Sequence, residues 1–195
     1  MSKDWQILGI DHIAIPVENY EGWKRVYLDL FGGELFHETL DASPTGASSM
    51  KLCGIKIGGL SIALISGIDR KEKSQVSKFV EKHGDHGFQH VAVRVDNLEA
   101  FVRWGRENGL QFLGQILQRK DNFGQIKQIF AKKFDPNLNV DEAPFYEFVE
   151  RPKEGEIFED IAADSFSDEF AQELYREVED AGHGVFIDVA RIMQK

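Results

Sequence analysis

The sequence contains little of what a secreted, membrane-spanning or nucleic-acid-binding protein requires. Cys53 is its single cysteine, so no internal disulfide can form, which favours a reducing compartment. No apolar run approaches the roughly 20 residues that span a bilayer, and the first residues do not resemble a signal peptide. No run of Lys and Arg indicates the basic face of a nucleic-acid binder. We therefore expect a soluble, cytoplasmic protein that contacts neither nucleic acid nor membrane.

What the sequence does contain suits one compact domain. Its 195 residues, of which 42% are hydrophobic, are enough to bury a full core. The net charge of −10 mainly favours solubility. We expect a single domain over residues 1–195, built from two modules at about 5–68 and 86–152 and a helical tail at about 153–195.

The two modules follow from an internal repeat with an offset of 78 positions. Residues 11–17 read D-H-I-A-I-P-V, and residues 89–95 read Q-H-V-A-V-R-V. The match places His12 on His90 and continues past the strand into the start of a helix. Because the offset stays constant over a strand, a turn and a helix start, it predicts a duplicated unit.

Each copy is expected to contain a strand, a helix and three further strands, which gives an α+β fold of duplicated βαβββ modules. The first copy has strands at about 7–17, 34–40, 49–57 and 60–66, with a helix at about 20–31. The second has strands at about 88–95, 111–118, 125–132 and 144–151, with a helix at about 97–108. Further elements are a helix from Ser74 to His83, a helix at about 167–181 and a strand at 184–192.

Two histidines occupy matched positions of the repeat, and each is followed two places later by an alanine. Strand side chains alternate between two faces, so each alanine leaves room beside its histidine. A lone histidine in an apolar strand is more often structural, but a matched pair favours a shared site. The expected faces are Ile10, His12, Ala14 and Pro16 in the first copy, and Phe88, His90, Ala92 and Arg94 in the second. The histidines without a repeat partner are interpreted as solvated or structural: His37, His83, His86 and His183.

Glu147 is the expected third ligand. It lies in the last strand of the second copy among apolar and aromatic neighbours, where an unpaired carboxylate would be costly. Glu150 alternates to the other face beside Arg151 and is interpreted as a solvated charge at the rim. The corresponding strand of the first copy offers Ile62 or Ala63, so the duplicated site lacks a fourth protein ligand. Two histidines and one carboxylate with open positions are typical of non-haem Fe(II) oxygenases, whereas a structural zinc site has four protein ligands.

Three stretches resemble the 4-hydroxyphenylpyruvate dioxygenase family, and its C-terminal domain in particular, within the vicinal oxygen chelate superfamily. They are residues 74–98, SQVSKFVEKHGDHGFQHVAVRVDNL, residues 128–130, QIF, and residues 145–151, FYEFVER. The resemblance covers most of residues 5–182. It implies a half-open barrel of paired βαβββ modules.

The resemblance also implies a chemistry. Its substrate would be an α-keto acid that chelates Fe(II), or another divalent metal, held by His12, His90 and Glu147, with O₂ as the second substrate. By the same resemblance Gln128 and Phe130 line the substrate pocket, and Phe170 of the tail helix closes over it. Ser49 matches a serine of that pocket. The family has a second domain that these residues do not contain, and the apolar surface left exposed would favour a homodimer.

Three alternatives stay open, because a fold does not determine a function. The same fold occurs in extradiol ring-cleaving dioxygenases with the same three ligands. It also occurs in metal-dependent isomerases and epimerases, which typically have a further ligand in the first module, and in ligand-binding proteins without catalytic activity, which usually lack the ligands.

Overall fold

Two copies of a strand–helix–three-strand unit follow one another in the computed structural model, which describes residues 3–121, 124–132 and 143–153. The first copy consists of β1 (Ile7–Pro16), α1 (Tyr20–Arg25), a π-helical segment (Val26–Leu30), β2 (Glu34–Thr39), β3 (Ser48–Ile57) and β4 (Leu60–Asp69). Helix α2 (Gln75–His83) connects it to the second copy. The second copy consists of β5 (His90–Val95), α3 (Leu98–Glu107), β6 (Phe112–Asp121), β7 (Gly124–Ala131) and β8 (Phe145–Glu150).

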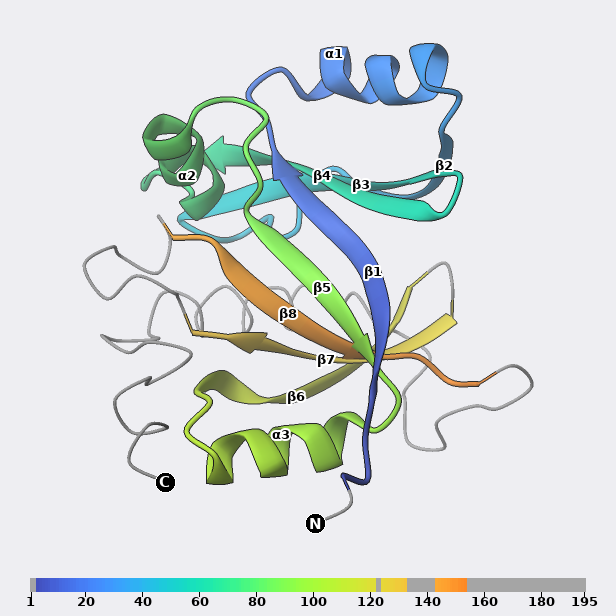
Figure 1. Ribbon diagram of the computed structural model, residues 1–195. Helices are drawn as coiled ribbons and strands as arrows, with labels where there is room; N and C mark the ends of the chain where they lie inside the picture. Colours follow the sequence, from blue (N-terminus) through green and yellow to red (C-terminus); the bar gives the residue numbers. More distant parts are fainter. Residues whose placement is uncertain (1–2, 122–123, 133–142, 154–195) are drawn as a thin grey trace.

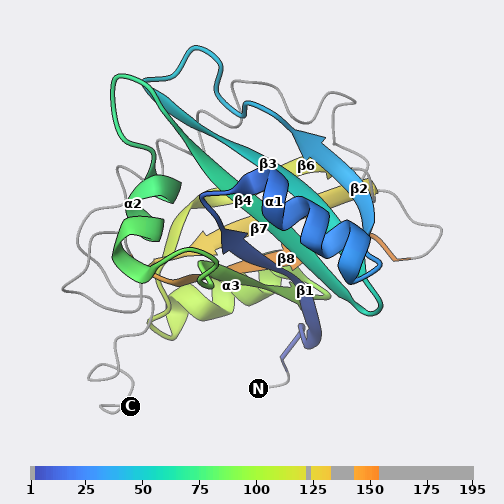
Figure 2. The same cartoon turned by 90° about the horizontal axis from the view of Figure 1, so that it is seen from above.

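The described strands form one mixed sheet in which the second half repeats the first in mirrored order. The strand order is β2-β3-β4-β1-β5-β8-β7-β6. Strand β1 pairs in parallel with β4, β5 pairs in parallel with β8, and the two halves join through the antiparallel pair β1–β5. The sheet curls into a half-barrel, with α1 outside one half and α3 outside the other (Figures 1 and 2). This arrangement confirms the duplicated βαβββ fold.

The local signals explain where the elements begin and end. Asn19 and Asn97, which are matched in the repeat, both cap a helix by accepting a backbone N–H bond with the side chain. Ser74 caps α2 in the same way. The helix expected at 20–31 is α-helical only to Arg25 and continues as the π-helical segment. Gly58 has a φ of 56° in the two-residue turn between β3 and β4, a conformation that glycine adopts without strain.

Each half packs its helix against the outer face of the sheet. One cluster of buried residues joins α1 to β1, β3 and β4, and includes Tyr20, Ile55 and Leu64. A second joins α3 to its strands around Phe101 and Phe148. Full burial of such a side chain contributes about 1.5–3 kcal/mol. With the outer faces filled by the helices, the inner face of the half-barrel is left to line a cavity.

Within the described ranges, no helix combines the length and the apolar character needed to cross a bilayer. The expected helix at 167–181 and the expected strand at 184–192 lie outside the described residues. The single domain over residues 1–195 and its module bounds stay a prediction.

Candidate metal centre

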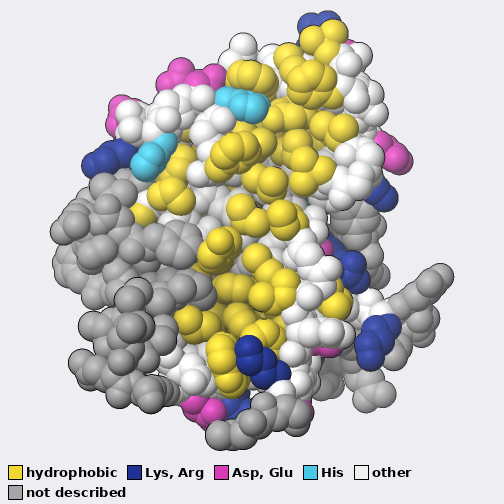
Figure 3. All heavy atoms as spheres, viewed as in Figure 1, with side chains coloured by type: hydrophobic (Ala, Val, Ile, Leu, Met, Phe, Trp, Pro, Cys, Tyr) yellow, Lys and Arg dark blue, Asp and Glu magenta, His cyan; other side chains and the backbone are white. Residues whose placement is uncertain are grey.

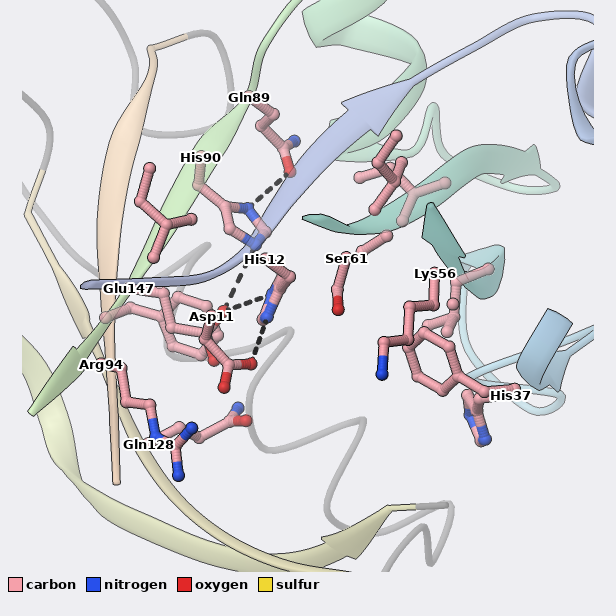
Figure 4. Close-up of a pocket in the computed structure, with 18 of the residues that line it drawn as sticks. Asp11, His12, His37, Lys56, Ser61, Gln89, His90, Arg94, Gln128 and Glu147 are labelled. Carbon is pink, nitrogen blue, oxygen red and sulfur yellow. Dashed lines mark hydrogen bonds and ion pairs between the residues drawn. The ribbon is translucent and has the colours of Figure 1, made fainter. Parts of the chain in front are cut away.

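Three neighbouring strands at the middle of the sheet bring His12, His90 and Glu147 together. In the strand register His12 faces Ala92 across β1 and β5, and Ala92 faces Glu147 across β5 and β8. His90 faces Ala14 in the same antiparallel pair. Residues paired in register point to the same face, and both alanines are too small to fill it. The two imidazoles and the carboxylate therefore converge, and Figure 4 shows His12, His90 and Glu147 pointing toward one another.

The three side chains form a compact donor set. Glu147 Oε2 lies 3.2 Å from His12 Nε2 and 3.3 Å from His90 Nε2. One ligand atom from each residue lies within 4.8 Å of the others. Two donors that are each about 2.1 Å from one ion and at right angles to each other are about 3.0 Å apart. The two carboxylate–imidazole spacings are close to this value. The three side chains thus lie together as expected, and their role as metal ligands stays a proposal.

Each histidine is held through its other ring nitrogen by the residue that precedes it. His12 Nδ1 lies 3.1 Å from Asp11 Oδ1, and His90 Nδ1 lies 3.3 Å from Gln89 Oε1. These acceptors favour the tautomer with hydrogen on Nδ1, which leaves Nε2 to bind a metal. Asp11 and Gln89 are themselves matched by the repeat. Arg151 in turn fixes Asp11 with two hydrogen bonds, of 2.7 Å from Nε and 3.0 Å from Nη2.

A bulge in β1 makes the contact between Asp11 and His12 available. The pairing with β5 shifts by one residue between Ile10 and His12, so Asp11 occupies an extra position. In a regular strand these adjacent side chains would point to opposite faces. The alternation expected from Ile10 to Pro16 is therefore interrupted at Asp11, a feature that the sequence pattern does not contain.

The buried charges of the three residues compensate one another. Burial alone lowers the pKa of His12, but the negative charges of Glu147 and Asp11 outweigh it and raise this pKa to about 9. At His90 burial prevails over Glu147, and the pKa lies below its ordinary value. Burial raises the pKa of Glu147, but His12 and His90 hold it well below its ordinary range. In the metal-free site at neutral pH, His12 is therefore a charged imidazolium with a proton on both ring nitrogens, His90 is neutral and Glu147 is ionised.

The donor set suits a divalent metal. Glu147 is 2% exposed, and its Oε1 has no hydrogen-bond partner among the described residues. A buried carboxylate oxygen without a partner is costly unless a cation or a donor satisfies it. Imidazole nitrogen and carboxylate oxygen are ligands of Fe(II) and Zn(II) alike. The residues present therefore fit such an ion.

The register identifies the counterpart of Glu147 in the first copy. Ala14 pairs with Ala63 in β4, as its repeat equivalent Ala92 pairs with Glu147 in β8. Of the two residues that the sequence offered, Ala63 occupies this place and Ile62 does not. Because alanine offers no ligand atom, this position adds no fourth ligand to the set.

A cavity of about 410 Å³ opens beside the donor set and is mostly apolar, as ligand pockets are. Gln128 and Phe130 of β7 both line it, together with Phe145 of β8, and a role of these residues in substrate binding stays a proposal. The Phe145 ring stacks on His90, with ring centroids 4.8 Å apart. Phe170, the expected lid residue, lies outside the described residues.

Some expected roles differ from the structure. Ser49 does not line the cavity; its hydroxyl donates to Asp41 at 2.6 Å and accepts from the backbone N–H of Ser43. Glu150 is more than a charge at the rim, since it accepts a 2.7 Å hydrogen bond from the backbone of Leu98 at the start of α3. In both cases the side chain hydrogen-bonds to a residue that the sequence spacing did not indicate, Asp41 for Ser49 and Leu98 for Glu150.

The remaining described histidines lie outside the donor set. His86 accepts or donates a 2.6 Å hydrogen bond with Tyr27 and stacks on Trp23, and exposed His83 stacks on Phe79. His37 lines the cavity but is not part of the donor set.

Three residues that orient the donor set were not predicted from the sequence: Asp11, Gln89 and Arg151. Asp11 and Gln89 were recognisable, because each precedes a matched histidine at the same offset. Arg151 gave no such signal, since its role depends on which strands lie side by side.

Comparisons with known proteins agree with this fold. The family model of the Glyoxalase/Bleomycin resistance protein/Dioxygenase superfamily matches residues 9–137. Human mitochondrial methylmalonyl-CoA epimerase is 24% identical over 98 residues, which are 50% of this chain and 52% of the relative. A mutant of 4-hydroxymandelate synthase from Streptomyces coelicolor superposes with a TM-score of 0.70 at 22% identity, covering 88% of this chain and 53% of that one. Methylmalonyl-CoA epimerase from Mycobacterium tuberculosis superposes with a TM-score of 0.56 at 24% identity, covering 79% of this chain and 95% of that one.

The chain thus spans about half the length of the curated relative and of the synthase. The family match covers most of both copies of the repeat, from β1 to beyond β7. Divalent metal binding is typical of this superfamily, and His12, His90 and Glu147 lie where the strands converge. The chain belongs to the glyoxalase, bleomycin resistance protein and dioxygenase superfamily, whose fold is the vicinal oxygen chelate fold.

Proposed function

We propose that the protein is a metal-dependent enzyme, and that an Fe(II) dioxygenase acting on an α-keto acid is the function that the site supports best. The substrate would be 4-hydroxyphenylpyruvate or a related arylpyruvate. The observation that carries this proposal is the donor set of two histidines and one carboxylate, with Ala63 where a fourth ligand would stand. Such a set leaves coordination positions for a chelating substrate and O₂.

The described residues would have two roles at the metal, binding it and orienting its ligands. His12, His90 and Glu147 would hold the ion, and Asp11 and Gln89 would keep the imidazoles oriented. When bound there, a divalent metal supplies Lewis-acid polarisation of a chelated substrate and, as Fe(II), reactivity toward O₂.

The second part of the site would hold the rest of the substrate. Phe130 and Phe145 lie with ring centroids 5.9 Å apart and give an apolar wall that excludes water and suits an aryl group. Gln128, which is fully buried, offers an amide that can both donate to the substrate and accept from it.

A metal-dependent epimerase is the second candidate, and the names of the curated relatives favour it over the first. An epimerase moves a proton to and from carbon, which requires a general base at the substrate. Among the described lining residues the two carboxylates already have partners: Asp11 bonds to Arg151 and His12, and Glu147 lies between the histidines. The lining also contains His37, and a histidine can act as a general base as well as a carboxylate can, so the lining is compatible with both candidates.

An oxygen electrode separates the candidates. Anaerobically Fe(II)-loaded protein is mixed with a panel of arylpyruvates, catechols and 2-methyl-branched acyl thioesters. We expect O₂ uptake with an arylpyruvate, none in Glu147→Ala and unchanged uptake in the surface variant His83→Ala. Uptake with catechols alone would indicate ring cleavage. Proton exchange at the thioester without O₂ uptake would indicate the epimerase, and no activity would favour a binding protein.

A cytoplasmic location is likewise a proposal, which rests on the single, buried Cys53.

A further inference from the structure

The cavity has a positive balance of charge although the whole chain is acidic. Its described lining includes four cationic side chains and two carboxylates: Lys56, Arg94, Arg119, Arg151, Asp11 and Glu147. The net charge of the protein is −10. A bound divalent metal would increase the positive balance further. Low-dielectric walls concentrate such a field, so the cavity favours a ligand with more than one negative charge.

Arg94 is placed to contact the far end of such a ligand. It pairs in register with Val149 of β8, and Val149 pairs with Gln128 of β7. Residues in one row point to the same face, so Arg94 and Gln128 stand on either side of the short Val149 side chain. Both line the cavity that holds the donor set (Figure 4).

This row lies next to the metal row. Glu147 is two residues before Val149 in β8, and residues two apart on one face are roughly 6.6 Å apart along a strand. A ligand anchored at Glu147 and its histidines would therefore extend over one such spacing to reach Arg94. An acid with a chain of about six carbons suits this distance.

Three buried polar atoms of the row have no partner among the described residues. The buried Nε of Arg94 has no hydrogen-bond acceptor within the described ranges, and neither amide atom of the fully buried Gln128 has a partner there. Native proteins pair nearly all such groups, so the missing partner is expected to come from a ligand. A guanidinium only donates, and a carboxylate accepts two parallel N–H bonds from it.

We propose that Arg94 and Gln128 form an anion subsite, and that the cavity binds a second class of α-keto acid beside the arylpyruvates proposed above, the 2-oxo dicarboxylic acids. The 2-oxo acid end would chelate the metal held by His12, His90 and Glu147, and the distal carboxylate would bind the Arg94 guanidinium. The part of this proposal that concerns chelation of the metal rests on the function proposed above. The subsite itself rests on the row of Arg94, Val149 and Gln128.

The test compares two acids that differ only in the distal carboxylate, 2-oxoadipate and 2-oxohexanoate. Their affinities for the metal-loaded protein are measured by calorimetry under anaerobic conditions. We expect the dicarboxylate to bind at least about tenfold more tightly, since hydrogen bonds to charged groups are worth this much. Arg94→Gln should abolish this preference while changing the affinity for 2-oxohexanoate less than about twofold. Arg94→Lys should retain part of it. The control Arg103→Gln, which removes an exposed arginine of α3, should leave it unchanged.

A second measurement separates the subsite from the metal chemistry. The Nε–H signal of Arg94 in a ¹⁵N spectrum of metal-free protein is assigned by its loss in Arg94→Gln. Adipate should shift this signal and hexanoate should not. If adipate shifts it but neither oxo acid binds the metal-loaded protein, the proposed function fails and the subsite stands. An unmoved signal, or a preference for the dicarboxylate that persists in Arg94→Gln, overturns the subsite.

Discussion

Metal binding should release one proton at neutral pH, because His12 must lose its proton before Nε2 can bind an ion. Glu147 and Asp11 raise the pKa of His12 to about 9, whereas burial keeps His90 neutral. Below the pKa of His12 the metal competes with one proton, so the apparent association constant rises about tenfold per pH unit. From pH 7 to the plateau above the pKa the total gain is about 100-fold, or about 2.7 kcal/mol. Above about pH 9 the affinity should level off.

Calorimetric titration with Mn(II) measures this directly. Titrations at pH 7 in buffers of different ionisation enthalpy give the number of protons released, which we expect to be about one. Asp11→Asn removes one of the charges that raise the pKa of His12 and should lower this number. His83→Ala, remote from the cavity, should not change it. Release of no proton in the wild type, or an affinity independent of pH between 6.5 and 8.5, would refute the reasoning.

Three further outcomes follow from the site and the surface. Gln128→Ala should raise KM about tenfold with kcat little changed, as measured by steady-state O₂ uptake, if the amide binds ground state and transition state equally. Ala63→Glu should place a carboxylate at the open side of the donor set. The variant should then retain more metal after chelator treatment and turn over substrate more slowly. Turnover equal to that of the wild type would count against the assigned place of Ala63. Hydrophobic side chains gather along the middle of the face in Figure 3, and Ile7, Leu8 and Ile10 of β1 are more than half exposed. Because an exposed apolar surface favours association, sedimentation at micromolar concentration should give a homodimer. A clean monomer would contradict this.

The repeat explains why so much of the fold was predictable. A constant offset fixed two copies of the same unit, and glycines and capping asparagines marked its turns and helix starts. The same offset identified His12 and His90. Glu147 followed from the cost of a carboxylate in an apolar strand.

The features of the site that the sequence did not predict are contacts that depend on how the strands pair. Whether Ile62 or Ala63 stands in the place of Glu147 is decided by the parallel register of β1 and β4. The contact of Asp11 with Arg151 joins residues 140 positions apart and needs the bulge in β1 as well. Strand alternation places Arg94 on the face of His90, but its neighbours Val149 and Gln128 are identified only when β5, β8 and β7 are placed side by side. Such contacts leave no periodic pattern within a single strand.

The metal content of the protein tests the central claim most directly. Wild type, His12→Ala, His90→Ala, Glu147→Ala and the control His83→Ala are loaded with Fe(II) anaerobically, desalted and analysed by mass spectrometry of the metal, with circular dichroism to verify folding. We expect about one ion per chain in the wild type and the control, and loss of the ion in folded His12→Ala and His90→Ala. A folded His90→Ala protein that retains one ion per chain would contradict it.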